Sequence, residues 1–258
     1  MLIDTHCHLF APEFGGQYAK ILQAAETAGV TDLVVPTVER RDFAAVRQIC
    51  ALYPACRPAY GIHPIFVESA SEDDLAALRE YLSAGQAVAL GEIGLDFFIE
   101  HHDKAHQAHF LTEQLKLARE FDLPVLLHTR RAVDATLALL RRHKVRGGIA
   151  HAFSGSRQQA EEFIKLGFKL GFGGAMTYPR ATRLRELART LPLSSIVLET
   201  DAPDMAPEFV PPGEPNLPEY LPRIAQTLAS LRGLPPDEIA RITTDNALAV
   251  LPLTELAT

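Results

Sequence analysis

The segment at the start of the chain carries the most unusual chemistry, because Asp4, His6 and His8 occupy every second position there. Alternate side chains of an extended strand point to the same face, so these three are expected to share one face. Neutral imidazole is the most common protein ligand of divalent transition metals. Two such histidines predict part of a metal site, although polar residues at a strand end are the plain alternative. Cys7 is expected on the opposite face, packed against a helix.

Other residues that could bind metal occur singly, each near the end of a predicted strand. A single histidine or acid in such a place is usually a hydrogen-bonded structural group or a helix cap. A set of them at corresponding depth is harder to explain, because polar residues must then interrupt several apolar strands. The six candidate ligands are His6, His8, Glu92, His128, His151 and Asp201. Four histidines with two carboxylates favour two divalent ions (Mg, Mn or Zn) that share a bridging carboxylate.

Apolar strands alternate with amphipathic helices along the chain. The predicted strands cover 1–9, 32–36, 57–61, 87–91, 124–128, 148–152, 168–173 and 195–200. The predicted helices cover 17–28, 43–52, 73–83, 105–121, 132–143, 157–166, 180–190 and 219–232, and 236–251 adds one more. Parallel strands need such crossover helices. Eight units in this length predict an α/β fold, a TIM (β/α)8 barrel with one extra C-terminal helix, in which the strand ends bring the candidate residues together.

Composition limits the alternatives. The chain has 258 residues, of which 47% are hydrophobic, so we expect a single domain over 1–258. Its formal net charge of −7 argues against a broad positive surface for duplex nucleic acid. Three cysteines without paired spacing indicate a reducing compartment. The sequence shows no signal-peptide pattern and no long apolar run, so we expect a cytoplasmic protein without a membrane segment or an obligate protein partner.

Three further segments are interpreted as structural. The proline-rich segment 202–218 predicts a stiff loop that forms one wall of the site. The basic run at 141–146 ends a predicted helix and is interpreted as solvated charge on the face opposite the site. A histidine cluster near 101–109 has helical metal-site spacing, but we interpret it as the polar start of a helix, and a substrate role for one member stays open. Its members are His101, His102, His106 and His109.

Six motifs, in this order, resemble the signatures of the TatD family of metal-dependent deoxyribonucleases, and are most similar to its YjjV-like branch. They are DTHCH at 4–8, GIHP at 61–64, GEIGLD at 91–96, LPVLLH at 123–128, HAFSG at 151–155 and ETDAP at 199–203. The resemblance spans nearly the whole chain. It implies an amidohydrolase-type barrel with one ion held by His6, His8 and Asp201, a second by His128 and His151, and Glu92 bridging them. An arginine that the family often carries is missing from 210–216, so no phosphate contact is expected there.

The resulting hypothesis is a two-metal deoxyribonuclease of the 3'-5' exonuclease type that cleaves DNA with a metal-activated water. Asp201 would accept the water proton and later help protonate the leaving oxygen, while Glu92 bridges the ions. His63 and Arg130 would contact the substrate phosphate. An acidic chain fits single-stranded DNA or a strand end better than a duplex.

Two alternatives stay open at this point. A small-molecule amidohydrolase or phosphoesterase could use the same binuclear centre. Relatives that bridge their metals with a carboxylated lysine are disfavoured, because Glu92 holds the corresponding place. A non-catalytic binding module that has kept the barrel is the other alternative, and it is disfavoured because none of the six candidate ligands is missing.

Overall fold

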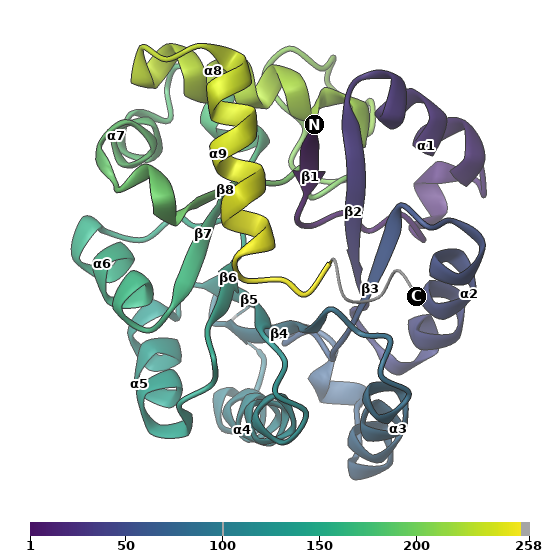
Figure 1. Ribbon diagram of the computed structural model, residues 1–258. Helices are drawn as coiled ribbons and strands as arrows, with labels where there is room; N and C mark the ends of the chain where they lie inside the picture. Colours follow the sequence, from purple (N-terminus) through teal and green to yellow (C-terminus); the bar gives the residue numbers. More distant parts are fainter. Residues whose placement is uncertain (100, 254–258) are drawn as a thin grey trace.

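The computed structural model describes residues 1–99 and 101–253. Within these ranges a single sheet holds eight strands, each paired in parallel with the next in the order β1 to β8 (Figure 1). The strands are β1 (Leu2–Asp4), β2 (Val30–Pro36), β3 (Cys56–Tyr60), β4 (Ala89–Asp96), β5 (Val125–Arg130), β6 (Gly148–Ala150), β7 (Phe168–Phe172) and β8 (Ile196–Leu198).

Hydrogen bonds between the first and last strand segments close the sheet into a barrel. The amide of Thr5 donates to the carbonyl of Leu198 at 3.2 Å, and the amide of Asp201 donates to the carbonyl of His6 at 2.8 Å. Past these bonds, Cys7 forms a parallel bridge with Ala202. The predicted TIM barrel is therefore confirmed, and its closing seam lies at two of the candidate ligands, His6 and Asp201.

Helices follow the strands and surround the barrel (Figure 1). Local signals set several of their starts: Ser71 and Asp74 form a capping box at α3, and Asp103 accepts two backbone amides at the start of α4. The helices are α1 (Tyr18–Thr27), α2 (Phe43–Leu52), α3 (Glu72–Ser83), α4 (Lys104–Glu120), α5 (Val133–His143), α6 (Arg157–Lys165), α7 (Thr182–Thr190), α8 (Leu221–Arg232) and α9 (Pro236–Leu248). None of the described helices is long and apolar enough to cross a membrane.

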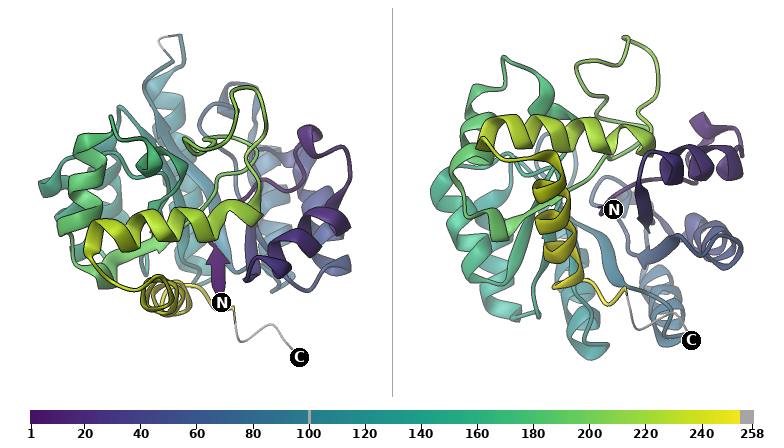
Figure 2. Two further views of the ribbon diagram at one scale, coloured as in Figure 1. Left: turned by 90° about the horizontal axis from the view of Figure 1, so that it is seen from above. Right: turned by 45° about the horizontal axis from the view of Figure 1, so that its top comes forward.

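The extra C-terminal helix, α9, covers the amino-terminal end of the barrel (Figure 2). Ala247, Val250 and Leu251 pack there in one buried cluster with inward-facing strand residues such as Ile3 and Val34. An apolar cluster of this kind excludes water from the lower half of the barrel. The predicted extra helix is thus confirmed, and it leaves the opposite, carboxyl-terminal end as the open one.

Two predicted strand boundaries are wrong. β1 ends at Asp4, so His6 and His8 lie in an irregular segment after the strand and not within it. β4 runs from Ala89 to Asp96, which places Glu92 inside a strand that was expected to end before it. The predicted boundary of β4 is misplaced because Gly91 and Gly94 of the GEIGLD motif suggest a turn. In the structure both glycines lie within β4 and pack closely against β5.

Gly94 shows how tight this packing is. A Cβ atom at Gly94 would lie 1.8 Å from the carbonyl oxygen of His128, and the register between β4 and β5 shifts between Leu90 and Ile93. Only glycine permits such an approach of two backbones. The other predicted elements appear with ends displaced by a few residues. A single domain over 1–258 stays a prediction, since residues 254–258 lie outside the described part.

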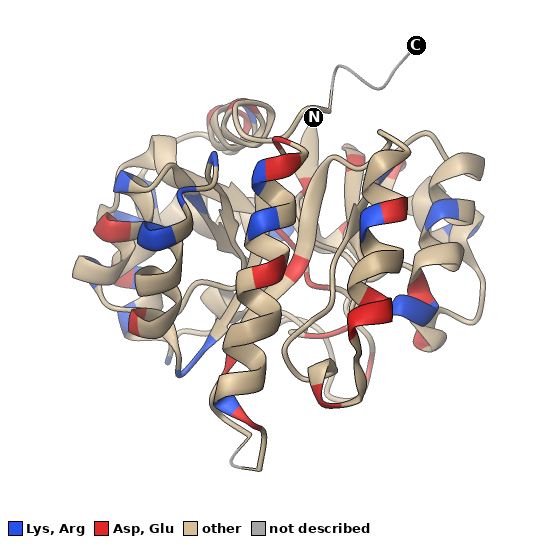
Figure 3. Cartoon of the chain, turned by 90° about the horizontal axis from the view of Figure 1, so that it is seen from below, with Lys and Arg blue, Asp and Glu red and all other residues tan. Residues whose placement is uncertain are grey.

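Charged residues of both signs are interspersed on the outer helices (Figure 3). The predicted basic run follows this pattern, because Arg141 pairs with Glu162 at 2.7 Å and Arg146 donates to the carbonyl of Asp122 at 2.9 Å. Arg141 lies at the end of α5 and Arg146 lies just before β6, on the side of the barrel opposite the carboxyl-terminal ends of the strands. The run is therefore part of a mixed, solvated surface, as expected.

Candidate metal centre

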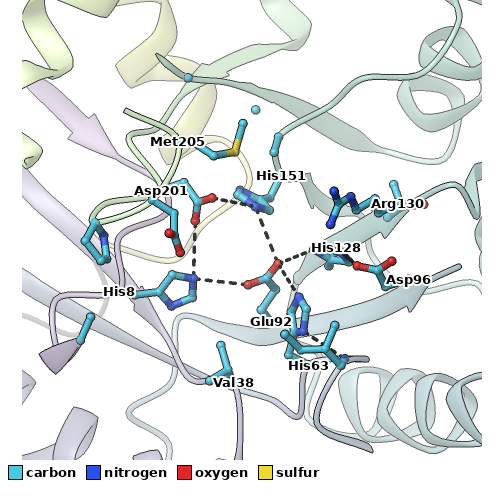
Figure 4. Close-up of a pocket in the computed structure, with 18 of the residues that line it drawn as sticks. His8, Val38, His63, Glu92, Asp96, His128, Arg130, His151, Asp201 and Met205 are labelled. Atoms are coloured by element: carbon cyan, nitrogen blue, oxygen red, sulfur yellow. Dashed lines mark hydrogen bonds and ion pairs between the residues drawn. The ribbon is translucent and has the colours of Figure 1, made fainter. Parts of the chain in front are cut away.

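One large cavity, of about 960 Å³, opens at the carboxyl-terminal ends of the strands. Its floor carries histidines and acids that come from different strands (Figure 4). They include His8, His63, Glu92, His128, His151 and Asp201. His6 lies behind them with no exposed surface. The structure thus brings all six sequence-predicted ligands, and His63 with them, to one place.

The carboxylate of Glu92 stands between two groups of histidines. Its Oε2 atom lies 3.1 Å from Nε2 of His6 and 3.6 Å from Nε2 of His8. Its Oε1 atom lies 3.1 Å from Nδ1 of His128 and 3.7 Å from Nε2 of His151. Each oxygen therefore faces a different set of imidazoles, as a bridging carboxylate would.

Asp201 faces the same two groups from the other side of the cavity. Its Oδ1 atom lies 3.5 Å from Nε2 of His8 and 3.7 Å from Nε2 of His6, while Oδ2 lies 3.7 Å from Nε2 of His151. Asp201 adopts a left-handed backbone with φ 59°, as does Ala152 with φ 44°. Non-glycine residues seldom adopt this conformation outside sites where the surroundings enforce it.

These separations fit a divalent ion. Ligand atoms about 2.0 to 2.2 Å from one tetrahedral ion lie about 3.3 to 3.6 Å from each other. The Nε2 atoms of His6 and His8 lie 3.2 Å from each other and 3.1 to 3.7 Å from the facing oxygens of Glu92 and Asp201. Neutral imidazoles and carboxylates are also the donors that zinc and manganese accept. These residues therefore fit a divalent ion.

His63 adds a fifth imidazole to the centre. Its Nε2 atom lies 3.5 Å from Oε1 of Glu92, and its Nδ1 atom accepts the amide of Ile65 at 3.2 Å. Burial lowers the pKa of His63 to about 4, so its imidazole is neutral. His63, Glu92 and His128 form one of the groups close enough to hold an ion. The structure thus places buried His63 directly beside the predicted ligands, close enough to Glu92 and His128 to share an ion with them.

The carboxylates give the cavity a negative potential. Burial opposes the charge of Glu92, yet the neighbouring His6, His63 and His151 hold the pKa of its carboxyl well below the usual range. Burial likewise opposes protonation of His151, but Glu199, Asp201 and Glu92 raise its pKa to about 10. A site that draws protons onto a buried imidazole also attracts a cation.

Two buried acids that the sequence analysis did not single out support the histidines from behind. Oε1 of Glu199 lies 3.2 Å from Nδ1 of His151 and accepts the amide of Ala152 at 2.6 Å. Oδ2 of Asp96 lies 3.1 Å from Nε2 of His128. Carboxylates in such places fix ring orientation and raise ligand basicity. Asp96 belongs to the motif GEIGLD and Glu199 to the motif ETDAP, and membership in these motifs was the only indication in the sequence that the two acids could belong to the site.

The proline-rich loop forms one wall of the cavity, as predicted. Pro203, Asp204 and Met205 line it. Buried Asn216 fixes the loop, because its side-chain amide donates to the carbonyls of Thr200 at 2.7 Å and Asp204 at 3.0 Å. The loop is therefore attached to the same segment that carries Asp201.

The remaining predicted residues lie at the edge or outside. Arg130 ends β5 and lines the cavity with an exposed side chain. In the histidine cluster of α4, His106 contacts the carbonyl of Val67 at 2.9 Å and His109 contacts Glu72 at 2.8 Å. No potential metal-binding group among the described residues includes a member of this cluster. Cys7 is fully buried in the core, which confirms its predicted packing role.

A parallel barrel with histidines and acids gathered at its carboxyl-terminal end defines the class of metal-dependent barrel hydrolases. Comparison with known proteins specifies the family. The profile described as "TatD related DNase" matches residues 3–252, so the chain belongs to the TatD-related DNase family. The predicted family is thereby confirmed.

Individual relatives agree with this assignment. The chain is 46% identical over 247 residues, 95% of each protein, to the "Uncharacterized metal-dependent hydrolase YjjV" of Escherichia coli strain K12. It is 31% identical over 253 residues to the "3'-5' ssDNA/RNA exonuclease TatD" of Erwinia billingiae, covering 95% of this chain and 97% of that one. The crystal structure of the Escherichia coli YjjV protein superimposes with a TM-score of 0.94, covering 97% of this chain and 98% of that one at 44% identity.

Proposed function

We propose that this protein is a two-metal deoxyribonuclease that removes nucleotides from the 3' end of single-stranded DNA. The position of Glu92 carries the proposal, because its two carboxylate oxygens face different sets of imidazoles. Membership in the TatD-related DNase family and similarity to a protein named as a 3'-5' ssDNA/RNA exonuclease support the choice of substrate.

In this proposal the six ligands divide into two sets. His6, His8 and Asp201 would hold one ion, His128 and His151 would hold the other, and Glu92 would contribute to both. When bound, such a pair of divalent ions lowers the pKa of water and neutralises charge on the phosphate. In support of this division, the facing atoms of Glu92 and the four histidines lie 3.1 to 3.7 Å apart, close to the spacing of ligand atoms on one ion.

Asp201 acts as the proton acceptor in this proposal. Burial opposes its charge, but His151 and His8 lower the pKa of its carboxyl, so it is ionised at neutral pH. Its two oxygens face both groups of imidazoles, where a water molecule could reach it. Neutral His63 is placed to contact a phosphate oxygen or the leaving group, and Arg130 at the cavity edge supplies a positive charge.

The shape and charge of the cavity support a strand end as substrate. Its volume of about 960 Å³ can hold a nucleotide, and the barrel floor beneath it is closed by α9. Among the described residues that line the cavity, Arg41 and Arg130 are the only lysines or arginines. A cavity with so few cations is suited to one terminal phosphodiester, whereas a long duplex needs many phosphate contacts.

A small phosphate ester is the second candidate substrate. Much of the cavity wall is apolar, with Phe10, Ile65, Phe66 and Phe153 among its lining residues. These side chains could surround an apolar leaving group as readily as a nucleobase. The same metal centre would serve either reaction.

One experiment separates the two candidates. The protein, loaded in turn with Mg²⁺, Mn²⁺ and Zn²⁺, is incubated with end-labelled single-stranded DNA, the matching RNA and bis(4-nitrophenyl) phosphate. A ladder that grows from the 3' end of the DNA supports the nuclease. Turnover of the ester with both nucleic acids intact would instead support the esterase, and RNA degraded with DNA intact would contradict the choice of DNA.

A further inference from the structure

A group of cations and an aromatic ring lies at the cavity edge, outside the predicted ligands. Phe98, in the loop after β4, is one of the few large apolar side chains that are exposed, at 42%. The guanidinium carbon of Arg130 lies 3.6 Å from the centre of its ring, and that of Arg131 lies 4.6 Å from it. We call Phe98, Arg130 and Arg131 the arginine platform.

Hydrogen bonds connect the platform to Asp96, the acid that contacts the predicted ligand His128. The amide of Phe98 donates to Oδ1 of Asp96 at 2.8 Å, while Oδ2 of the same carboxylate contacts His128. The amide of Phe97 donates to the carbonyl of Arg130 at 2.9 Å. Arg131 adopts a left-handed backbone with φ 54°, which is unusual for an arginine. The hydrogen bonds position Phe98 and the backbone of Arg130 beside the predicted ligand His128, and Arg131 contacts the same ring.

The two guanidinium groups are available to a ligand. Among the residues that the structure describes, neither Arg130 nor Arg131 forms an ion pair with an acid. By contrast, Arg41, the other arginine of the cavity lining, pairs with Glu39. Both platform arginines are exposed, so they retain their donors for a partner from solution.

We propose that the arginine platform binds backbone phosphates of the DNA strand that extends out of the cavity. This inference rests on the proposed function. A guanidinium group binds phosphate through two parallel N–H donors, and stacking on a ring restricts it before binding, so less entropy is lost. The platform supplies locally the positive charge that the chain, at a net charge of −7, lacks globally. It therefore distinguishes a strand with several phosphates from a substrate with only one.

Substitution of Arg131 tests the proposal, because this arginine does not line the cavity. Arg131→Ala and Phe98→Ala are compared with Arg142→Ala, which removes an exposed arginine from α5. The KM for a 12-nucleotide single strand is divided by the KM for a dinucleotide. We expect this ratio to rise about tenfold in Arg131→Ala and about threefold in Phe98→Ala, and to be unchanged in Arg142→Ala.

A binding measurement makes the test independent of cleavage. Fluorescence anisotropy gives the Kd of a labelled 12-nucleotide strand at several salt concentrations. The slope of log Kd against log salt should fall by about one in Arg131→Ala. An Arg131→Ala protein with unchanged KM ratio and unchanged salt slope would overturn the platform. If instead the wild type bound the strand through Arg131 but cleaved neither DNA length, the proposed function would fail while the platform stood.

Discussion

Nδ1 of His151 lies 3.2 Å from Oε1 of Glu199, and both side chains are almost completely buried. The opposite nitrogen of the same ring points toward Glu92 and Asp201, each at 3.7 Å. Glu199 thus contacts the imidazole from the side away from the cavity, where it sets which nitrogen faces a metal ion. Such a partner strengthens the ligand without touching the ion.

Replacing this acid should weaken metal binding. In Glu199→Gln the amide keeps the size of the side chain but loses the charge that favours a proton on Nδ1 of His151. We expect the affinity for one of the two proposed ions to fall about 10- to 100-fold, which isothermal titration calorimetry of the metal-free protein would measure. Glu72→Gln is the matched control, because Glu72 contacts His109 at 2.8 Å on the surface. Equal affinities in the two variants would contradict the role of Glu199.

The space for Glu199 depends on Gly171 in β7. A Cβ atom at Gly171 would lie 2.2 Å from Oε2 of Glu199, so Gly171→Ala must displace that carboxylate. We expect a loss of about 1 to 3 kcal/mol in the free energy of unfolding, measured in urea, together with weaker metal binding. A Gly171→Ala protein with wild-type stability and metal affinity would show that neither property depends on the present position of Glu199.

Asp201 should be required for turnover beyond its contribution to metal binding. Asp201→Asn keeps an oxygen that can ligate but cannot accept a proton at neutral pH. We expect kcat to fall by about 10² to 10⁴-fold. The metal content of the variant is measured in parallel by mass spectrometry, because loss of an ion would explain the same effect. Near-normal turnover with two ions bound would refute the role of Asp201 as proton acceptor.

Removing metal should destabilise the whole protein. The carboxylates of Glu92 and Asp201 are buried together, and a bound cation would relieve their desolvation. At a free ion concentration 100 times its Kd, a single ion adds about 2.7 kcal/mol to the free energy of unfolding. The midpoint of thermal unfolding should therefore fall in excess EDTA and recover when Mn²⁺ is added back. A midpoint that does not depend on metal would argue against tight binding at this centre.

The fold and the six candidate ligands could be predicted because a histidine or an acid lies at or near the end of several apolar strands in the sequence. His128 and Asp201 each interrupt or end an apolar run, and the barrel arrangement brings such ends together. The length of β4 could not be read in the same way. Gly91 and Gly94 have the appearance of a turn, and only the close approach of β5 shows that the strand continues through Glu92.

The supporting residues were harder to find for a different reason. Glu199 precedes Asp201 by two positions, and nothing in the sequence says that it faces His151, whose strand is two places away in the barrel. The contact of Phe98 with Arg131 depends on a left-handed backbone at Arg131, which residue types alone do not predict. Contacts of this kind arise from three-dimensional packing and have no periodic signal.

The packing of α9 against the barrel floor has a consequence for how a nucleic acid strand would be handled. Since Ala247, Val250 and Leu251 fill that end with apolar contacts, a strand cannot thread through the protein as it does through a ring-shaped nuclease. Under the proposed function, each released mononucleotide would leave by the opening through which the strand came in. The shortened end would share this single opening with the departing product, so we expect digestion to be distributive, with every molecule in a population shortened at a similar pace.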